Sequence, residues 1–343
     1  MSATLLGVAR ALRGPLAAVG AAALLAALFL WMLGADPLLA VRALARGAFG
    51  DARALENTFV RFCPLALVGL AVALAFRAGV WNIGGEGQLY VGALAATLLA
   101  TRLAPDAPAL VLAPLVLALG ALGGAAWAAL AALLKVTRGV SEVLSTILLN
   151  FIAGLAIAWA VHGPLQEASG AYPQSDAFPA AARLALLPGL RRVHVGLALA
   201  LAALPLVWFV LFRTAAGLRL RAVGLASEAA RYAGIDPARE TVRVLAASGA
   251  LAGLAGAIEV AGVTGRLFEN LSAGYGFTAI AVALLARLQP LAVLPAALFF
   301  AALATGSAAM QRSAAVPSVA VRVIEGLVIL FSVGFALPAR NAR

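Results

Sequence analysis

The sequence predicts an all-α polytopic membrane protein with about ten transmembrane helices, and three observations support this fold class. Hydrophobic residues make up 64% of the 343-residue chain and charged residues 11%, whereas soluble domains carry about 25% charged residues. Apolar runs of about 18 residues recur along the chain, and each can cross the roughly 30 Å hydrocarbon core of a bilayer. Two glycine-interrupted segments occupy matching positions in the two halves, which indicates an inverted repeat.

Ten apolar segments follow one another along the chain. They run roughly over residues 15–33, 61–78, 88–103, 109–134, 145–161, 195–212, 244–263, 277–288, 291–310 and 319–336. The third and eighth are short for a full span, and short glycine-flanked segments are typical of broken or tilted helices. We therefore interpret residues 1–343 as one transmembrane domain with a loop at about 213–243.

The formal net charge of +11 does not indicate a nucleic-acid partner. Basic residues fall in short gaps between apolar segments, as the positive-inside rule expects, and form no aromatic-interleaved stripe. Six arginines lie within residues 213–243, which disfavours translocation of this loop. We expect this loop and both termini to be cytoplasmic. With Cys63 the sole cysteine and two histidines, we expect no disulfide framework, metal site or cofactor.

The inverted repeat is suggested by NIGGEGQL (82–89) and NLSAGYGFT (270–278). With one insertion both share the frame Asn-apolar-(small)-small-Gly-X-Gly, and each follows a full apolar span and precedes a short one. Five predicted helices separate the two copies, so the second is upside down relative to the first.

Glycines allow a helix to break, and the freed backbone groups are tolerated at membrane depth only where protein or a water-filled cavity satisfies them. We therefore expect the two segments to line or gate a substrate pathway, with tight interhelical turns as the alternative. The candidate residues are Asn82, Gly85, Glu86, Gln88, Asn270, Ser272, Tyr275 and Phe277.

Charged residues inside the apolar runs are further candidates. Glu259 sits in the middle of the seventh segment, and a carboxylate in hydrocarbon is costly unless it faces a cavity or a partner. Glu259 is therefore a further pathway candidate, with a paired structural role as the alternative. Arg322 and Glu325 are spaced to pair with each other on the last helix.

The arginine-rich loop contains one predicted helix. Ser227 is placed to cap it, Glu228 falls in its first turn, and Gly234 follows its end near Ala233. A short cytoplasmic helix of this kind could transmit force to a soluble partner, whereas an ordinary basic loop would have no such role.

Four motifs together carry a family resemblance. They are AFRAGVWNIGGEGQLYVGA (75–93), GVSEVLSTILLNFIA (139–153), GLRLRAVGLASEAARYAGI (217–235) and SGALAGLAGAIEVAG followed by SAGYGFTAIAVALLA (248–286). Over roughly residues 55–335 the chain resembles permease subunits of bacterial ABC importers in the branched-chain amino acid and simple-sugar superfamily, in the nucleoside branch linked to basic membrane lipoproteins. The resemblance implies a type II ABC importer-like fold in the inner membrane.

The resemblance also implies partners: a cytoplasmic ABC ATPase, a second homologous permease, an external substrate-binding lipoprotein and the lipid bilayer. The AVG-x3-EAAR-x-AGI stretch is similar to the ATPase-coupling loop of this family. It maps to Ala222, Val223, Gly224, Glu228, Ala229, Ala230, Arg231, Gly234 and Ile235. The sequence departs from the family where Leu225-Ala226-Ser227 replaces a frequent Asn-Pro, and where Ala286 replaces a common glycine.

The sequence therefore predicts a transport subunit that is not itself an enzyme, because it contains no G-x4-G-K-[ST] loop for ATP. By resemblance it moves a small polar solute, a nucleoside, into the cytoplasm. A simple sugar such as ribose is the first alternative. An ion-coupled secondary transporter that uses Glu86 and Glu259 is the second. A lipid-modifying enzyme would need an interfacial cluster of acids or histidines, which the sequence lacks.

Overall fold

The computed structural model describes residues 20–314 together with 316, 317, 320, 323, 324, 326, 327 and 329–331. Within this part the chain is helical, and its β-pairing is confined to isolated bridges. A first helix runs over Gly20–Met32. The helices after it are α2 (Pro37–Phe49), α3 (Ala52–Arg77), α4 (Gly85–Leu98), α5 (Ala109–Arg138), α6 (Glu142–Val161), α7 (Gly196–Arg213), α8 (Ala215–Leu225), α9 (Ser227–Tyr232), α10 (Pro237–Glu259), α11 (Tyr275–Leu285) and α12 (Val293–Ser313).

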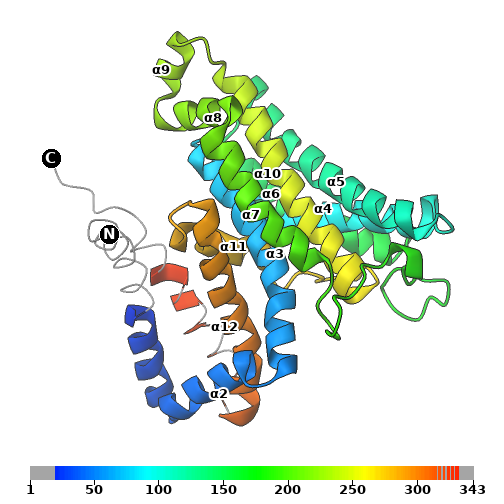
Figure 1. Cartoon of the computed structure of the whole chain (residues 1–343), viewed down its shortest axis with the longest axis vertical. Helices are drawn as coiled ribbons and strands as arrows, with labels where there is room; N and C mark the ends of the chain where they lie inside the picture. The colour runs from blue at the N-terminus through cyan, green and yellow to red at the C-terminus, as the bar shows by residue number, and fades with distance from the viewer. Residues whose placement is uncertain are drawn as a thin grey trace.

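Short helical turns extend or link these elements. The π-helical turns η1 (Leu99–Leu103) and η3 (Val260–Thr264) continue α4 and α10, and the 3₁₀ turns are η2 (Ala180–Ala182) and η4 (Pro290–Ala292). Figure 1 shows α8 and α9 at one end of the molecule and α2 at the opposite end.

Six helices in the described part are long and apolar enough to cross a membrane. They are Ala52–Arg77, Ala109–Arg138, Glu142–Val161, Gly196–Arg213, Pro237–Thr264 and Pro290–Ser313. The predicted multi-pass, all-helical architecture is therefore confirmed. The two short apolar segments correspond to α4 and α11. The tenth segment lies mostly outside the described residues, and so do Arg322 and Glu325.

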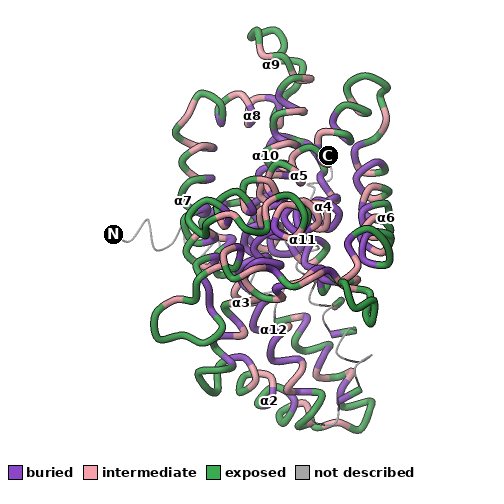
Figure 2. Tube along the Cα trace, turned by 90° about the vertical axis from the view of Figure 1, so that its right-hand side faces the viewer, coloured by how far each residue is buried: buried purple, intermediate pink, exposed green. Residues whose placement is uncertain are grey.

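Helix α3 lies at the centre of the protein. Residues 62–75 are all buried, which fits a helix that is apolar on every side. Figure 2 shows buried segments gathered in the middle of the molecule and exposed ones at α9 and the loops. The outer helices instead expose large apolar side chains such as Leu122, Leu155 and Leu206, as lipid-facing surfaces do.

Glycines bring α4, α5 and α10 into backbone contact. A Cβ atom added to Gly253 of α10 would overlap the carbonyl oxygen of Gly120 in α5, and one on Gly92 of α4 would overlap the backbone of Gly253. In a membrane such small-residue faces let helices approach closely, so that dispersion contacts replace the missing hydrophobic driving force.

The predicted short helix in the arginine-rich loop is present as α9, but the assignment of Ser227 as its cap is wrong. Helix α9 begins at Ser227, and the preceding Ala226 occupies the cap position without a side-chain hydrogen bond. The reason is that α8 continues to Leu225, so that only Ala226 separates the two helices. Gly234 follows the end of α9 with φ +80°, as expected of a helix terminator.

Ala286, which departs from the family pattern, ends α11 with φ −71°. Its backbone conformation therefore requires no glycine, and the turn with positive φ begins one residue later, at Arg287.

Candidate functional site

The first glycine segment breaks the helical path between α3 and α4. The chain leaves α3 at Ala78, turns at Gly79 with φ +72°, and becomes helical again at Gly85. The N–H groups of Gly79 and Val80 bond carbonyls at the end of α3, whereas the backbone groups that follow must be satisfied at membrane depth by other parts of the protein.

One face of α6 satisfies this break. Thr146 Oγ1 accepts the N–H of Ile83 at 3.3 Å, and Asn150 accepts the N–H of Gly87 at 2.8 Å while donating to the carbonyl of Ile83 at 2.9 Å. Together with Glu142 these residues are spaced i, i+4 and i+8 along α6, so they form one polar stripe. This stripe was not among the predicted features, although its i, i+4, i+8 spacing is present in the 139–153 motif.

Replacing Asn150 with leucine is expected to destabilise the protein, because the Gly87 N–H and the Ile83 carbonyl lose their partner. Each buried unsatisfied group costs about 1–3 kcal/mol. The measurement is the Tm of the purified protein in detergent. Leu148→Ala, on the exposed face of α6, serves as the matched control. Equal melting of the two variants would contradict the role given to Asn150.

Asn82 and Gln88 bond to each other across the break. The Asn82 Nδ2 donates to Gln88 Oε1 at 3.0 Å and to Ser248 Oγ at 2.8 Å, and Gln88 Nε2 donates to Asn82 Oδ1 at 2.9 Å. Ser248 in turn donates to the carbonyl of Ala71. All three side chains are buried, so in this conformation their polar groups bind the protein itself.

The second glycine segment breaks the path between η3 and α11. Ser272 Oγ accepts the N–H groups of Gly274 at 3.2 Å and Tyr275 at 3.0 Å, which satisfies the start of α11. Asn270 and Gly274 both have positive φ, at 55° and 85°.

The two breaks meet each other. Glu86 in the first turn of α4 accepts the N–H of Gly276 in the first turn of α11 at 2.6 Å, although the two residues are 190 positions apart. A Cβ atom on Gly276 would overlap the backbone nitrogen of Glu86, so the two backbones are in direct contact. The carboxylate is well placed, because the N-terminus of a helix carries partial positive charge.

Cavities lie on two sides of this junction. One of about 590 Å³ is lined by Glu259, Tyr275 and Arg61, and it adjoins one of about 740 Å³ lined by Asn270, Ser272, Tyr275 and Arg61. A third, of about 470 Å³, is lined by Glu86, Asn150, Asn270 and Phe277. The structure therefore brings most of the polar pathway candidates to cavities and leaves Asn82 and Gln88 in a closed network. Arg61 was not among the residues predicted for the pathway, because in the sequence it only marks the start of an apolar run.

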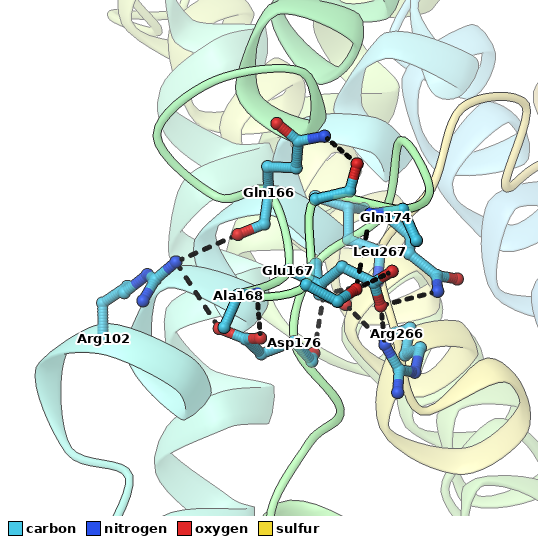
Figure 3. A network of polar contacts seen from close by, with 12 residues as sticks. Arg102, Gln166, Glu167, Ala168, Gln174, Asp176, Arg266 and Leu267 are labelled. Atoms are coloured by element: carbon cyan, nitrogen blue, oxygen red, sulfur yellow. Dashed lines mark hydrogen bonds and ion pairs between the residues drawn. The ribbon is translucent and has the colours of Figure 1, made fainter.

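The loop after α6 covers the second break. Glu167 forms an ion pair with Arg266 at 2.6 Å and accepts hydrogen bonds from Gln174 and Ser169, each at 2.8 Å. Figure 3 shows Gln174 and Arg266 both pointing at the Glu167 carboxylate. Hydrogen bonds from Ser169 and Gln174, together with the Arg266 guanidinium, hold the pKa of Glu167 below its usual value of 4.5.

The ion pair between Glu167 and Arg266 is expected to break in acid, when the Glu167 carboxylate is protonated. A carboxyl group with a lowered pKa in the folded state stabilises the fold above its ordinary value of 4.5, and this contribution is lost as pH falls through the lower, folded pKa. Limited proteolysis of residues 162–195 should therefore accelerate only well below pH 4.5. Glu167→Gln should be cleaved faster already at neutral pH. A cleavage rate unaffected by both acid and substitution would contradict this.

His194 lies near the end of the same loop. Its Nδ1 accepts the N–H of Gly196 at 3.1 Å, and burial lowers its pKa to about 4, so the ring is neutral at physiological pH. A Cβ atom on Gly262 would lie 2.8 Å from this ring, so His194 lies directly against the π-helical turn η3.

Comparisons with known proteins identify the family. Residues 54–333 match the family described as branched-chain amino acid transport system / permease component. The chain belongs to this family. No solved structure shows a significant match to it.

Curated relatives of this permease cover most of its length. A glucose ABC transporter permease protein of Haloferax volcanii is 38% identical over 92% of this chain and 83% of its own length. A guanosine ABC transporter permease protein of Bacillus subtilis is 36% identical over 84% and 83%, and a nucleoside ABC transporter permease protein of Lactococcus lactis is 31% identical over 92% and 89%. The chain is thus an ABC transporter permease.

In this permease the segment that resembles the coupling loop is α8 and α9. Val223 and Ala230 are buried, whereas Leu225 and Tyr232 are 89% and 91% exposed. Glu228 and Arg231 form an exposed ion pair at 3.5 Å. Helix α9 therefore projects side chains from the end of the molecule.

Helix α8 rests directly on the end of α3. A Cβ atom on Gly224 would overlap the carbonyl oxygen of Arg77, and Arg77 Nε donates to the carbonyl of Leu288 at 2.8 Å. The guanidinium groups of Arg77 and Arg221 both lie 5.2 Å from the centre of the Phe212 ring. The arginine-rich loop is thereby fixed to the ends of the helices it joins.

Proposed function

We propose that this permease imports a nucleoside into the cytoplasm of a bacterium, through a pathway at the junction of its two broken helices. The observation that carries the proposal is the direct contact of Glu86 with Gly276, beside cavities lined by polar residues. Broken helices whose ends meet at a cavity are where transporters bind their substrates. The guanosine and nucleoside permeases among its relatives support the choice of solute.

The proposed architecture has about ten transmembrane helices in two inverted halves. Support comes from the six long spans, from the short helices α4 and α11, and from the helix Gly20–Met32. The tenth would be the segment at 319–336. Residues 1–343 would form one transmembrane domain with both termini in the cytoplasm, because the six arginines of residues 213–243 favour that side.

The proposed energy source is a cytoplasmic ABC ATPase, which binds α8 and α9 of this permease and of a second, homologous permease. An external substrate-binding lipoprotein would deliver the solute. The exposed side chains of α9 and the similarity of residues 222–235 to the coupling loop of the family support this assignment. The chain would contribute no ATPase site of its own.

A simple sugar is the second candidate solute, and the glucose permease relative of Haloferax volcanii favours it. Nucleosides and sugars both carry hydroxylated rings, so the polar cavities fit either one.

Uptake into proteoliposomes tests the proposal. The permease is co-purified with the proposed ATPase and binding lipoprotein, and radiolabelled guanosine is the substrate. We expect ATP-dependent uptake that a protonophore does not inhibit and that unlabelled nucleosides compete better than ribose or glucose. Stronger competition by the sugars would favour the second candidate. Uptake that needs a proton gradient and no ATP would overturn the mechanism.

Thiol labelling tests the orientation. A cysteine introduced at Ala229, in a background where the buried Cys63 is replaced by serine, is expected to resist a membrane-impermeant reagent in intact cells and to react after permeabilisation. Labelling from the outside of intact cells would overturn the topology and the ATPase contact together.

A further inference from the structure

We infer that Glu259 recognises the hydroxyl groups of the transported solute, with Arg61 across the same cavity as the complementary donor. The ligand class is a neutral, polyhydroxylated ring, which is the part that nucleosides and simple sugars share. The inference rests on the proposed function and names the part of the solute that the pathway binds.

Glu259 differs from the other buried glutamates in the described part of the chain. Glu259 is 5% exposed, and its Oε2 has no hydrogen-bond partner. No basic group in the described part lies within 4.0 Å of its carboxylate. Each of the others has a bond: Glu56 accepts from the backbone of Arg192, Glu86 from Gly276, Glu142 from Lys135 and Glu240 from Arg243. Buried polar groups in native proteins are almost always bonded, so an unpartnered carboxylate calls for a ligand.

The second unpartnered buried side-chain atom in the described part lies beside the same cavity. It is Nε2 of His194, whose ring packs against Gly262, and Gly262 lines the cavity together with Glu259. Glu259 at the end of α10 and Gly262 within η3 are three residues apart, so the His194 ring packs against the same short segment that carries Glu259.

The cavity has the size and the lining of a small-molecule site. Its volume is about 590 Å³, within the range of about 300–1,000 Å³ typical of ligand pockets. Glu259, Arg61, Tyr275 and Thr305 contribute to its wall. Arg61 and Tyr275 also line the adjoining cavity of about 740 Å³, so a solute could pass from one to the other beside them.

The chemistry of the wall selects hydroxyl groups. A carboxylate only accepts hydrogen bonds and a guanidinium only donates them, whereas a hydroxyl group does both. A ring with several hydroxyls can therefore bond Glu259 and Arg61 together. The four arginines that line the cavity, Arg61, Arg191, Arg192 and Arg312, disfavour a cationic solute, and the unpaired Glu259 disfavours an anionic group placed beside it. A neutral polyol avoids both penalties.

The consequence is that the sugar ring of a nucleoside should matter more than its base. A site built to bond a hydroxyl strongly rejects an analogue that lacks it, because the buried polar groups are then left unpaired. We expect the wild-type transporter to take up guanosine with a KM at least about tenfold lower than its KM for the analogue 2′,3′-dideoxyguanosine.

The test compares Glu259→Gln with wild type in the reconstituted complex. Glu259→Gln should raise the KM for guanosine about tenfold, leave kcat within about twofold, and leave the KM for the dideoxy analogue unchanged. Asp106→Asn, which removes one carboxylate from an exposed loop, is the control and should match wild type. If the complex transports glucose instead, the same rise is expected in the KM for glucose.

The wild-type panel keeps the inference falsifiable should Glu259→Gln fail to insert. ATP-driven uptake that treats guanosine, its dideoxy analogue and free guanine alike would overturn the inference and leave the proposed function standing. A preference for guanosine monophosphate over guanosine would also overturn it, because an anion would then be the ligand. Absence of ATP-driven uptake of both guanosine and glucose would overturn the proposed function, and this assignment with it.

Discussion

Replacing Gly253 with leucine is expected to prevent stable folding of the permease. The Cβ atom would overlap the carbonyl oxygen of Gly120 and come within 2.8 Å of the backbone of Gly124, so α5 and α10 would have to separate. Both contacts are backbone atoms, which cannot move aside as the end of a flexible side chain can. Overpacking a core costs about 1–3 kcal/mol, and more where only backbone can yield. In a membrane the separated helices would also lose the close contacts that hold them together.

The measurement is the yield of monodisperse protein after detergent extraction, followed by size-exclusion chromatography. Gly154→Leu is the matched control, because this glycine also lies within an apolar helix and a Cβ atom there meets nothing within 4 Å. Normal yield of Gly253→Leu would show that α5 and α10 are not held by backbone contact.

Deleting residues 227–234, or reversing the charge of Glu228 with arginine, is expected to abolish ATP-driven uptake while the permease still inserts. Helix α9 is anchored at Ala230 but exposes Tyr232 almost completely, so its removal leaves the membrane core untouched. The Glu228 side chain is 74% exposed and is paired with Arg231 at the surface, so its reversal alters the charge of this surface rather than the fold.

Uptake and ATPase stimulation in proteoliposomes provide the measurement, with membrane insertion checked by fluorescence of a fused reporter. Asp106→Arg reverses a charge in a different exposed loop and should transport normally. Full uptake by the deletion variant would remove α9 from the energy-coupling mechanism.

Hydropathy was sufficient to locate the six long spans of the described part. Apolar length predicted the long spans, because any segment that crosses the hydrocarbon core must be both apolar and long enough. The glycine pairs predicted where α4 and α11 begin, since a broken helix needs residues that tolerate unusual backbone.

Hydropathy could not show which face of each helix meets protein. Lipid and protein interior are equally apolar, so burial leaves no periodic pattern in a helix such as α3. Asn82 and Glu259 illustrate the limit. Both are polar residues in apolar surroundings, but Asn82 finds Ser248 at a separation of 166 positions, whereas Glu259 Oε2 finds no partner in the described part of the chain. Only the fold decides between a closed network and an open cavity.

The cap assigned to Ser227 failed for a local reason. Serine before an acidic first turn is a sound N-cap pattern, because an N-cap residue is normally preceded by extended chain. Here the residues up to Leu225 belong to α8, so no extended segment precedes Ser227.

The position of Arg77 has a mechanical consequence. Its carbonyl contacts Gly224 of α8, while its side chain donates a hydrogen bond to the carbonyl of Leu288 just beyond α11. No slack separates these parts, because Gly224 and Gly79 also meet backbone to backbone. A movement of α8 would therefore be transmitted through Arg77 both to the end of α3 and to the segment just beyond α11.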